Sequence, residues 1–99
     1  MSLSSPRIVC AAVLYSVDGK PFIVAGPRHF DHVMHPVIEL LVETVNPDGL
    51  RPVQGFIDQH GEFYNRKNAW PIAERNGQIV KRVGGDGPDQ HGLFSENLY

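Results

Sequence analysis

The first residues with a chemical signature are Arg28 and His29, which follow the Gly26-Pro27 break where the sequence predicts that a helix begins. Free backbone N–H groups and the positive end of a helix dipole favour an anion at such a position. The planar guanidinium of Arg28 would add paired donors suited to phosphate. The alternative is that Arg28 forms only a surface ion pair, with Asp31 or Glu62 as the acid.

Three histidines, His29, His32 and His35, repeat at a spacing of three. On a helix this spacing places successive pairs on neighbouring positions, so two of them could bind zinc. The sequence lacks the matching glutamate of a metalloprotease motif, and the third imidazole would leave the shared face. We therefore expect solvated or core-edge histidines, with no metal and no cofactor.

A second group of aromatic, amide and cationic side chains lies in the segment 54–78. Phe56 and Phe63 could stack on a base, each contributing about 1–3 kcal/mol. Asn65 could read a base edge, and Arg66 could meet a phosphate. The alternative is that both phenylalanines belong to the core and that Asn65 only caps a helix. From the residues alone, Phe63 is assigned to the core.

Nucleophilic and phosphate-loop chemistry find little support in the sequence. Ser95 has no base near it along the chain, and no Gly-x-Ser-x-Gly elbow is present. The glycine-rich stretch 84–89 lacks the Lys-Ser/Thr pair that completes a Walker loop. The residues therefore indicate a binding protein and not an enzyme.

Length and charge narrow the class of protein further. A chain of 99 residues makes one domain with a thin core, for which help from a partner subunit is plausible. The formal net charge of −2 and the pI of about 6.2 provide no broad basic face for duplex nucleic acid. The lone Cys10 excludes an internal disulfide and favours a reduced, cytosolic setting. No apolar run approaches the roughly 20 residues of a membrane span, and no signal peptide is recognisable.

The elements that must position these side chains begin with a hairpin. The apolar run 8–15 predicts a strand, Asp18-Gly19 a tight turn, and the run 22–25 the returning strand. Apolar residues at helical spacing then predict a helix from about Arg28 to residue 44. Pro36 should kink that helix near Met34. The run 46–49 predicts a turn.

The second half of the chain predicts a strand over 54–58, a turn over 59–61 and a second short strand. A helix follows, capped by either Asn65 or Asn68, with Trp70 in the core and a stop at Asn76-Gly77. The run 79–83 predicts a short strand. The expected fold is a single α+β domain over 1–99, a small antiparallel sheet with two main helices. Residues 1–6 and 84–91 are expected to be flexible, and 92–99 to form a docked tail.

Several ordered pieces of the sequence together resemble one known family. They are Arg28-His29, Gln54-Gly55-Phe56, the run Phe63-x-Asn65-Arg66-Lys67-x-Ala69, Ala73 followed by Gly77-Gln78, and the terminal run 93–99. In their order and spacing they are similar to the Thoeris anti-defence 1 family of bacteriophage proteins. Pro36, Pro71, the loop 84–89 and Asn97 depart from that family's pattern.

The resemblance implies a sponge that binds and sequesters cyclic nucleotide immune signals without cleaving them. The implied ligands are glycocyclic ADP-ribose and cyclic oligonucleotides, in the cytoplasm of the infected bacterial host. The implied assembly is a homo-oligomer, a dimer or hexamer, formed through the sheet or the C-terminal tail. Two alternatives stay open: a small phosphodiesterase or hydrolase acting on ADP-ribose compounds with His29 or His32 as base, or a phage module whose tail docks a partner.

The resemblance also implies roles for individual residues. Phe56 would stack the adenine, and Asn65 with Arg66 would line the same pocket. Arg28 and His29, brought together from several subunits, would hold the phosphates of a larger cyclic ligand. Either Lys81 or Arg82 would supply a second stacking cation. The terminal run Phe94-Ser95-Glu96 would lie beside the segment 54–78, which would form one wall of the pocket.

Overall fold

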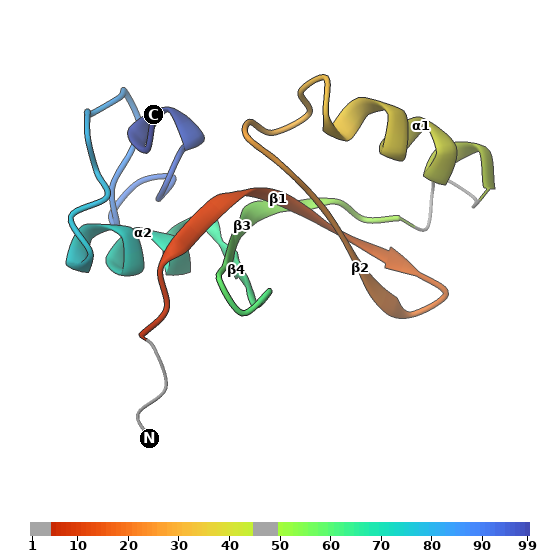
Figure 1. The fold of residues 1–99 in the computed structure, drawn as a ribbon, viewed down its shortest axis with the longest axis horizontal. Helices are drawn as coiled ribbons and strands as arrows, with labels where there is room; N and C mark the ends of the chain where they lie inside the picture. Colours follow the sequence, from red (N-terminus) through yellow and green to blue (C-terminus); the bar gives the residue numbers. More distant parts are fainter. Residues whose placement is uncertain (1–4, 45–49) are drawn as a thin grey trace.

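The structure is a computed structural model that describes residues 5–44 and 50–99. A four-stranded antiparallel sheet, ordered β2-β1-β3-β4, forms its centre and carries two α-helices (Figure 1). This confirms the predicted single α+β domain. The elements, in chain order, are β1 (Ile8–Val17), β2 (Lys20–Gly26), α1 (Met34–Thr44), β3 (Val53–Asp58), β4 (Phe63–Asn65), α2 (Arg66–Arg75) and a 3-10 turn, η2 (Ser95–Asn97).

The hairpin of β1 and β2 closes through the turn that the sequence predicts. Asp18 and Gly19 both have positive φ, 51° and 79°, and they directly connect the paired residues Val17 and Lys20. Such a two-residue turn matches the twist of the flanking strands, and an Asp-Gly pair tolerates its left-handed backbone. The hairpin is therefore fixed by local chemistry.

One face of the sheet, which we call the core face, supplies most of the buried side chains. Alternation places Ala11, Val13 and Tyr15 of β1 on it, and all belong to the core cluster. The register with β3 shifts between Ile8 and Cys10, so Val9 is an extra residue at a bulge. The bulge returns Ile8 to the core face, because one added residue reverses the alternation. Both helices contribute to the same cluster.

The opposite face, which we call the open face, is also apolar. Alternation and strand pairing place on it Leu14, Ile23, Val53, Ile57 and Phe63. Ile23 and Val53 keep 39% and 44% of their surface exposed. Phe63 was predicted to lie in the core, but its pairing with Ile57 turns it to the open face, where it is half-buried. Among the described residues, neither helix contributes its buried side chains to this face.

Glycine is required where Phe63 crosses the sheet. A Cβ placed on Gly55 would lie 2.5 Å from the Phe63 ring and 2.1 Å from the Tyr64 carbonyl oxygen. Any side chain at this position would displace the ring or the neighbouring strand. Gly55 therefore allows β4 and its aromatic ring to lie close to β3.

Helix α1 begins later than predicted, at Met34 and not near Arg28. The side chain of Asp31 accepts hydrogen bonds from the backbone N–H groups of Arg28 (2.9 Å), Val33 (3.0 Å) and Met34 (3.0 Å). This local bonding holds the preceding residues in turns and delays the helix. Pro36 consequently falls in the first helical turn, where its missing N–H costs little, and the predicted kink is wrong. The predicted turn at 46–49 lies outside the described residues.

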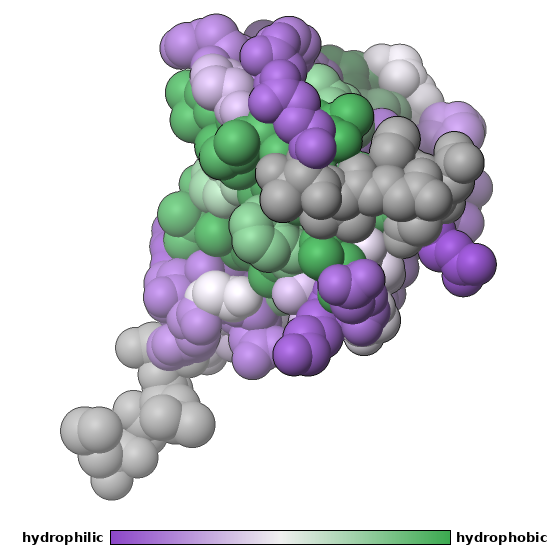
Figure 2. Space-filling model, turned by 90° about the vertical axis from the view of Figure 1, so that its right-hand side faces the viewer, coloured by the Kyte–Doolittle hydropathy of each residue, from purple (hydrophilic) through white to green (hydrophobic). Residues whose placement is uncertain are grey.

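Apolar residues also remain exposed on α1 and on the hairpin. Figure 2 views the end of the molecule that carries them and shows apolar side chains gathered between polar ones. Val37 and Leu40 of α1 are 43% and 65% exposed, and Phe22 of β2 is 43% exposed. Exposed apolar surface on a small chain is typical of a contact region.

Helix α2 has both of the end signals that the sequence contains. Asn65 is its N-cap, with a side chain that accepts the Asn68 N–H at 2.8 Å. At the other end Gly77 has φ +66°, and the Gln78 N–H donates to the Ala73 carbonyl at 2.8 Å. These are the bonds of a Schellman cap and confirm the predicted stop.

Side chains on α2 distinguish its two faces. Trp70 is 2% exposed, which confirms its place in the core. Pro71 lies inside the helix and is exposed, so the chain accepts the loss of one backbone bond at this point.

The predicted strand over 79–83 is absent, because two backbone N–H groups of this segment donate hydrogen bonds to one distant carbonyl and not to a neighbouring strand. The N–H groups of Val80 and Lys81 both donate to the main-chain oxygen of Asn97, at 2.8 and 3.4 Å. The Asn97 side chain is fully buried; it accepts the Phe94 N–H and donates to the Lys81 carbonyl and to Asp86. Asn97 therefore holds two remote stretches of chain together.

The last residues pack against α2 and the sheet. Leu93 is fully buried, and its N–H donates to the Arg66 carbonyl at 2.9 Å. The loop 84–91 before it is closed by a bridge between Gly87 and Gly92. The terminal segment 92–99 therefore lies on its own chain, beside α2 (Figure 1).

Candidate functional site

Most of the predicted site residues come together around one carboxylate, Glu96, for which the sequence predicted no role. Arg28 Nη1 lies 3.7 Å from Glu96 Oε1, and Ser95 Oγ donates to the same oxygen at 3.0 Å. Arg66 also lies close enough for its charge to interact with Glu96, and the Glu96 charge influences the pKa of His29. We call this set the Glu96 cluster; its members are Arg28, His29, Arg66, Phe94, Ser95 and Glu96.

Arg28 is held by the end of the chain. Its guanidinium lies over the Tyr99 ring, 4.9 Å from the centroid, and Nη2 donates to the Tyr99 main-chain oxygen. Nη1 is buried, and among the described residues it has no hydrogen-bond partner; Glu96 at 3.7 Å is too far for one. Arg28 therefore retains one unused donor that points into the cluster. It does not stand at a helix start, so the predicted help from a helix dipole is wrong.

Arg66 reaches the cluster from the first position of α2. Its guanidinium lies 4.5 Å above the Phe94 ring, and Nη2 donates to Gln54 Oε1. Burial lowers the pKa of Arg66, and Glu96 partly opposes that shift. A cation is also unfavourable at the positive end of a helix dipole. The site therefore holds a half-buried positive charge that a nearby anion would stabilise.

His29 lies against the sheet. Its Nε2 is 2.7 Å from the Gly55 carbonyl oxygen, and its ring meets the Phe56 ring edge-on at 5.1 Å. Because a carbonyl only accepts, Nε2 carries the proton. Burial lowers the pKa of His29, and the charge of Arg66 lowers it further, while the Gly55 hydrogen bond and Glu96 oppose the shift. His29 is therefore neutral at pH 7.

Phe56 and Asn65 are not free for the roles that the resemblance implies. Phe56 is 0% exposed in the core, so a base has no access to its ring in this structure. Asn65 is exposed beside Arg66, but its side-chain oxygen caps α2. The alternative reading of both residues, as core and as cap, fits the geometry.

Arg82 lies outside the cluster. Its guanidinium is 5.2 Å from the centroid of the Trp70 ring, and it donates two hydrogen bonds to Asp86, at 2.9 and 2.7 Å. These bonds, with those from the Val83 N–H and Asn97, hold the pKa of Asp86 well below its usual range. Arg82 therefore stacks on its own chain and serves the fold of the loop.

Glu96 and Tyr99 lie in the terminal run that carries the resemblance, but neither was predicted to have a role in the site. Glu96 is an acid one position after a predicted site residue, and two predicted cations without a carboxylate were a signal for it. Tyr99 had no short-range signal, because its partner Arg28 is far away in sequence.

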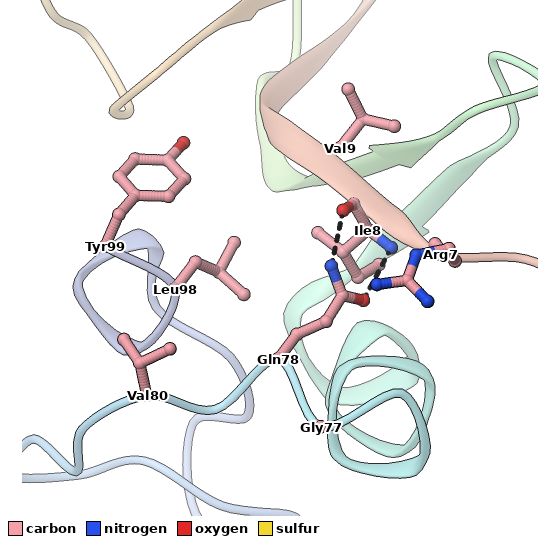
Figure 3. Close-up of a pocket in the computed structure, with 8 residues that line it drawn as sticks. All are labelled: Arg7, Ile8, Val9, Gly77, Gln78, Val80, Leu98 and Tyr99. Atoms are coloured by element: carbon pink, nitrogen blue, oxygen red, sulfur yellow. Dashed lines mark hydrogen bonds between the residues drawn. The ribbon is translucent and has the colours of Figure 1, made fainter.

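A cavity of about 290 Å3 lies beside the cluster, between the start of β1, the end of α2 and the last residues (Figure 3). It contains none of the predicted site residues. Tyr99 connects the two regions, because it lines the cavity and contacts Arg28.

Two other features are absent from the described ranges, 5–44 and 50–99. No group of three histidine, cysteine, aspartate or glutamate side chains is placed there to hold a metal ion. No helix in the same ranges is long and apolar enough to cross a bilayer.

Fold and site together define a small single-domain α+β protein in which two arginines and a histidine lie near one glutamate. Residues 7–99 match the family described as Phage T4 y16D protein, and the chain belongs to that family. No curated protein and no solved structure matches the chain. The match supports the expectation of a bacteriophage protein family, and the narrower relation to Thoeris anti-defence 1 stays a prediction.

Proposed function

We propose that this phage protein binds and sequesters a small, phosphate-bearing nucleotide signal of the cyclic type, without cleaving it. One observation carries the proposal: Arg28 and Arg66, from distant segments, each stack on an aromatic ring and converge on Glu96. Stacked guanidinium groups recognise phosphate with a defined orientation. The resemblance to signal sponges points to the same ligand class.

Glu96 occupies the position that an anionic ligand would take. Its side chain is 49% exposed and that of Arg28 is 37% exposed, so solvent reaches both. A phosphate that displaces Glu96 would reach the buried, unused Nη1 donor of Arg28 and the half-buried charge of Arg66. Displacing Glu96 into water costs little, because exposed ion pairs contribute only about 0–1 kcal/mol.

Binding fits the cluster better than cleavage does. The hydroxyl of Ser95 is buried and donates its hydrogen bond to Glu96. The neutral His29 directs Nε2–H at a backbone carbonyl and not at a nucleophile. A cluster that offers donors to an anion, without an activated nucleophile, supports retention of the ligand.

We also propose that the protein acts as a homo-oligomer in the cytoplasm of the infected host. The open face supports assembly through the sheet, because Leu14, Ile23, Val53 and Phe63 present an apolar layer without charges. Two such faces can pack as a sandwich about 10 Å apart. Replacing Ile23 with lysine should reduce the mass seen in sedimentation equilibrium. A wild-type monomer at high micromolar concentration would contradict assembly.

The binding proposal is tested with thermal shift and calorimetry against cyclic ADP-ribose isomers and cyclic oligonucleotides. After binding, the protein is heated and the released ligand is analysed by mass spectrometry. Intact ligand supports sequestration, whereas a hydrolysed product identifies an enzyme. If none of these ligands stabilised the protein, the proposal would be refuted. That result would favour a module that docks another protein.

A further inference from the structure

The cavity beside the cluster has walls suited to an apolar ring. Val9, Val80 and Tyr99 line it and keep 51%, 65% and 46% of their surface exposed. Arg7 adds a cation at the same cavity. Large apolar side chains left open around a hollow, with a few polar groups, are typical of a ligand site. The function proposed above leaves this cavity unused.

Hydrogen bonds fix the walls in place. Gln78 Oε1 accepts the Ile8 N–H at 3.0 Å, and Gln78 Nε2 donates to the Ile8 carbonyl at 2.8 Å, which ties the end of α2 to β1 (Figure 3). On the other side, the Val80 N–H donates to the Asn97 carbonyl and the Leu98 N–H to the Ser95 carbonyl. The hollow is therefore formed before any ligand arrives, which lowers the entropic cost of binding.

Tyr99 brings the cavity next to a cation of the cluster. Its ring lines the hollow, while the Arg28 guanidinium lies 4.9 Å from the ring centroid. A volume of about 290 Å3 is at the lower limit for a small-molecule pocket, so it suits one ring system of a larger ligand. The remainder of that ligand would extend past Tyr99 towards Arg28.

We propose that the cavity between Val9, Val80 and Tyr99 binds the base of the same nucleotide ligand whose phosphate Arg28 holds. The inference rests on the proposed function and deepens it, because it assigns the base to a place other than Phe56. A base has a planar apolar body that can lie on the Tyr99 ring, as bases lie on aromatic side chains elsewhere. The phosphate then meets the unused donor of Arg28.

Three probes separate the base from the phosphate: cyclic ADP-ribose, pyrophosphate and adenosine. Val80→Trp and, independently, Val9→Trp should fill the cavity. Each should lower the affinity for cyclic ADP-ribose at least tenfold in calorimetry and leave the affinity for pyrophosphate unchanged. Val37→Trp, at an equally exposed apolar position on α1, should bind as the wild type does. Arg28→Ala should weaken both cyclic ADP-ribose and pyrophosphate.

Adenosine gives a second readout on the unaltered protein. At millimolar concentration it should shift the backbone amide resonances of Gly77 and Val80 in a 15N spectrum. The base site would be refuted if these amides did not shift, or if both tryptophan variants bound cyclic ADP-ribose with full affinity. Either result would be compatible with sequestration of the ligand. A wild type that binds neither pyrophosphate nor cyclic ADP-ribose would overturn sequestration, and the base site with it.

Discussion

Glu96 acts as an internal competitor for the ligand anion, so replacing it with glutamine should strengthen binding. The change keeps the size of the side chain and removes its charge. The carboxylate lies 3.7 Å from Arg28, where one ion pair is worth about 1 kcal/mol in water. A phosphate on Arg28 would also stand within roughly 6 Å of Glu96, where repulsion costs about 0.7 kcal/mol. Together these terms, about 1.7 kcal/mol, predict affinity roughly 10- to 20-fold higher in Glu96→Gln.

The assay is calorimetric titration of pyrophosphate and cyclic ADP-ribose into wild type, Glu96→Gln and Glu39→Gln. Glu39 is the matched control, because it loses the same charge from a solvent-exposed pair with His35 on α1. The gain from Glu96→Gln should shrink in 0.5 M salt, since exposed charges are screened there. Thermal stability should change little, because exposed pairs contribute at most about 1 kcal/mol.

Weaker ligand binding by Glu96→Gln than by the wild type would refute the role of Glu96 as a competitor. That result would mean that Glu96 contacts the ligand directly, for example as an acceptor for a sugar hydroxyl. An equal gain in Glu39→Gln would show instead that net charge alone governs the affinity.

Three further predictions concern the fold that supports the site. Asn97→Ala should lower the free energy of unfolding by about 2–5 kcal/mol in urea titrations, because it leaves several buried partners unpaired; a loss below 1 kcal/mol would contradict this role. Phe56→Ala should cost about 3–5 kcal/mol as a core cavity, whereas an undisturbed fold with weaker nucleotide binding would restore its stacking role. The carboxylate of Asp86 has a depressed pKa, so it stabilises the fold above the unfolded value of about 3.9 and loses that effect as pH falls below it. Melting temperatures of wild type and Asp86→Asn should therefore differ at pH 6 and converge towards pH 2, and parallel profiles would count against this assignment.

Elements fixed by neighbouring residues were predictable from the sequence. The Asp18-Gly19 turn, the Asn65 cap and the Gly77 stop each depend on one or two side chains or on a backbone preference. The start of α1 was missed because the Asp31 side chain bonds three nearby N–H groups and competes with the helix. The strand over 79–83 was missed for a different reason: its N–H groups bond Asn97, which is remote in sequence.

The candidate site was predictable only in part. The resemblance identified Arg28, His29 and Arg66, and the fold brings them near one another. The resemblance gives no information on the register of β3, which places the whole Phe56 ring in the core. Glu96, Tyr99 and the cavity depend on contacts between the chain end and residues near its beginning, and local sequence patterns carry no signal for such contacts.

The contacts of the terminal segment have a consequence for protein synthesis. The guanidinium of Arg66 stacks on the Phe94 ring. That of Arg28 stacks on the Tyr99 ring and donates to the Tyr99 main-chain oxygen. Until those residues leave the ribosome and fold back, neither arginine has its partner. A nascent chain therefore gains the proposed ability to capture a signal only when residues 93–99 have emerged and folded back onto the domain.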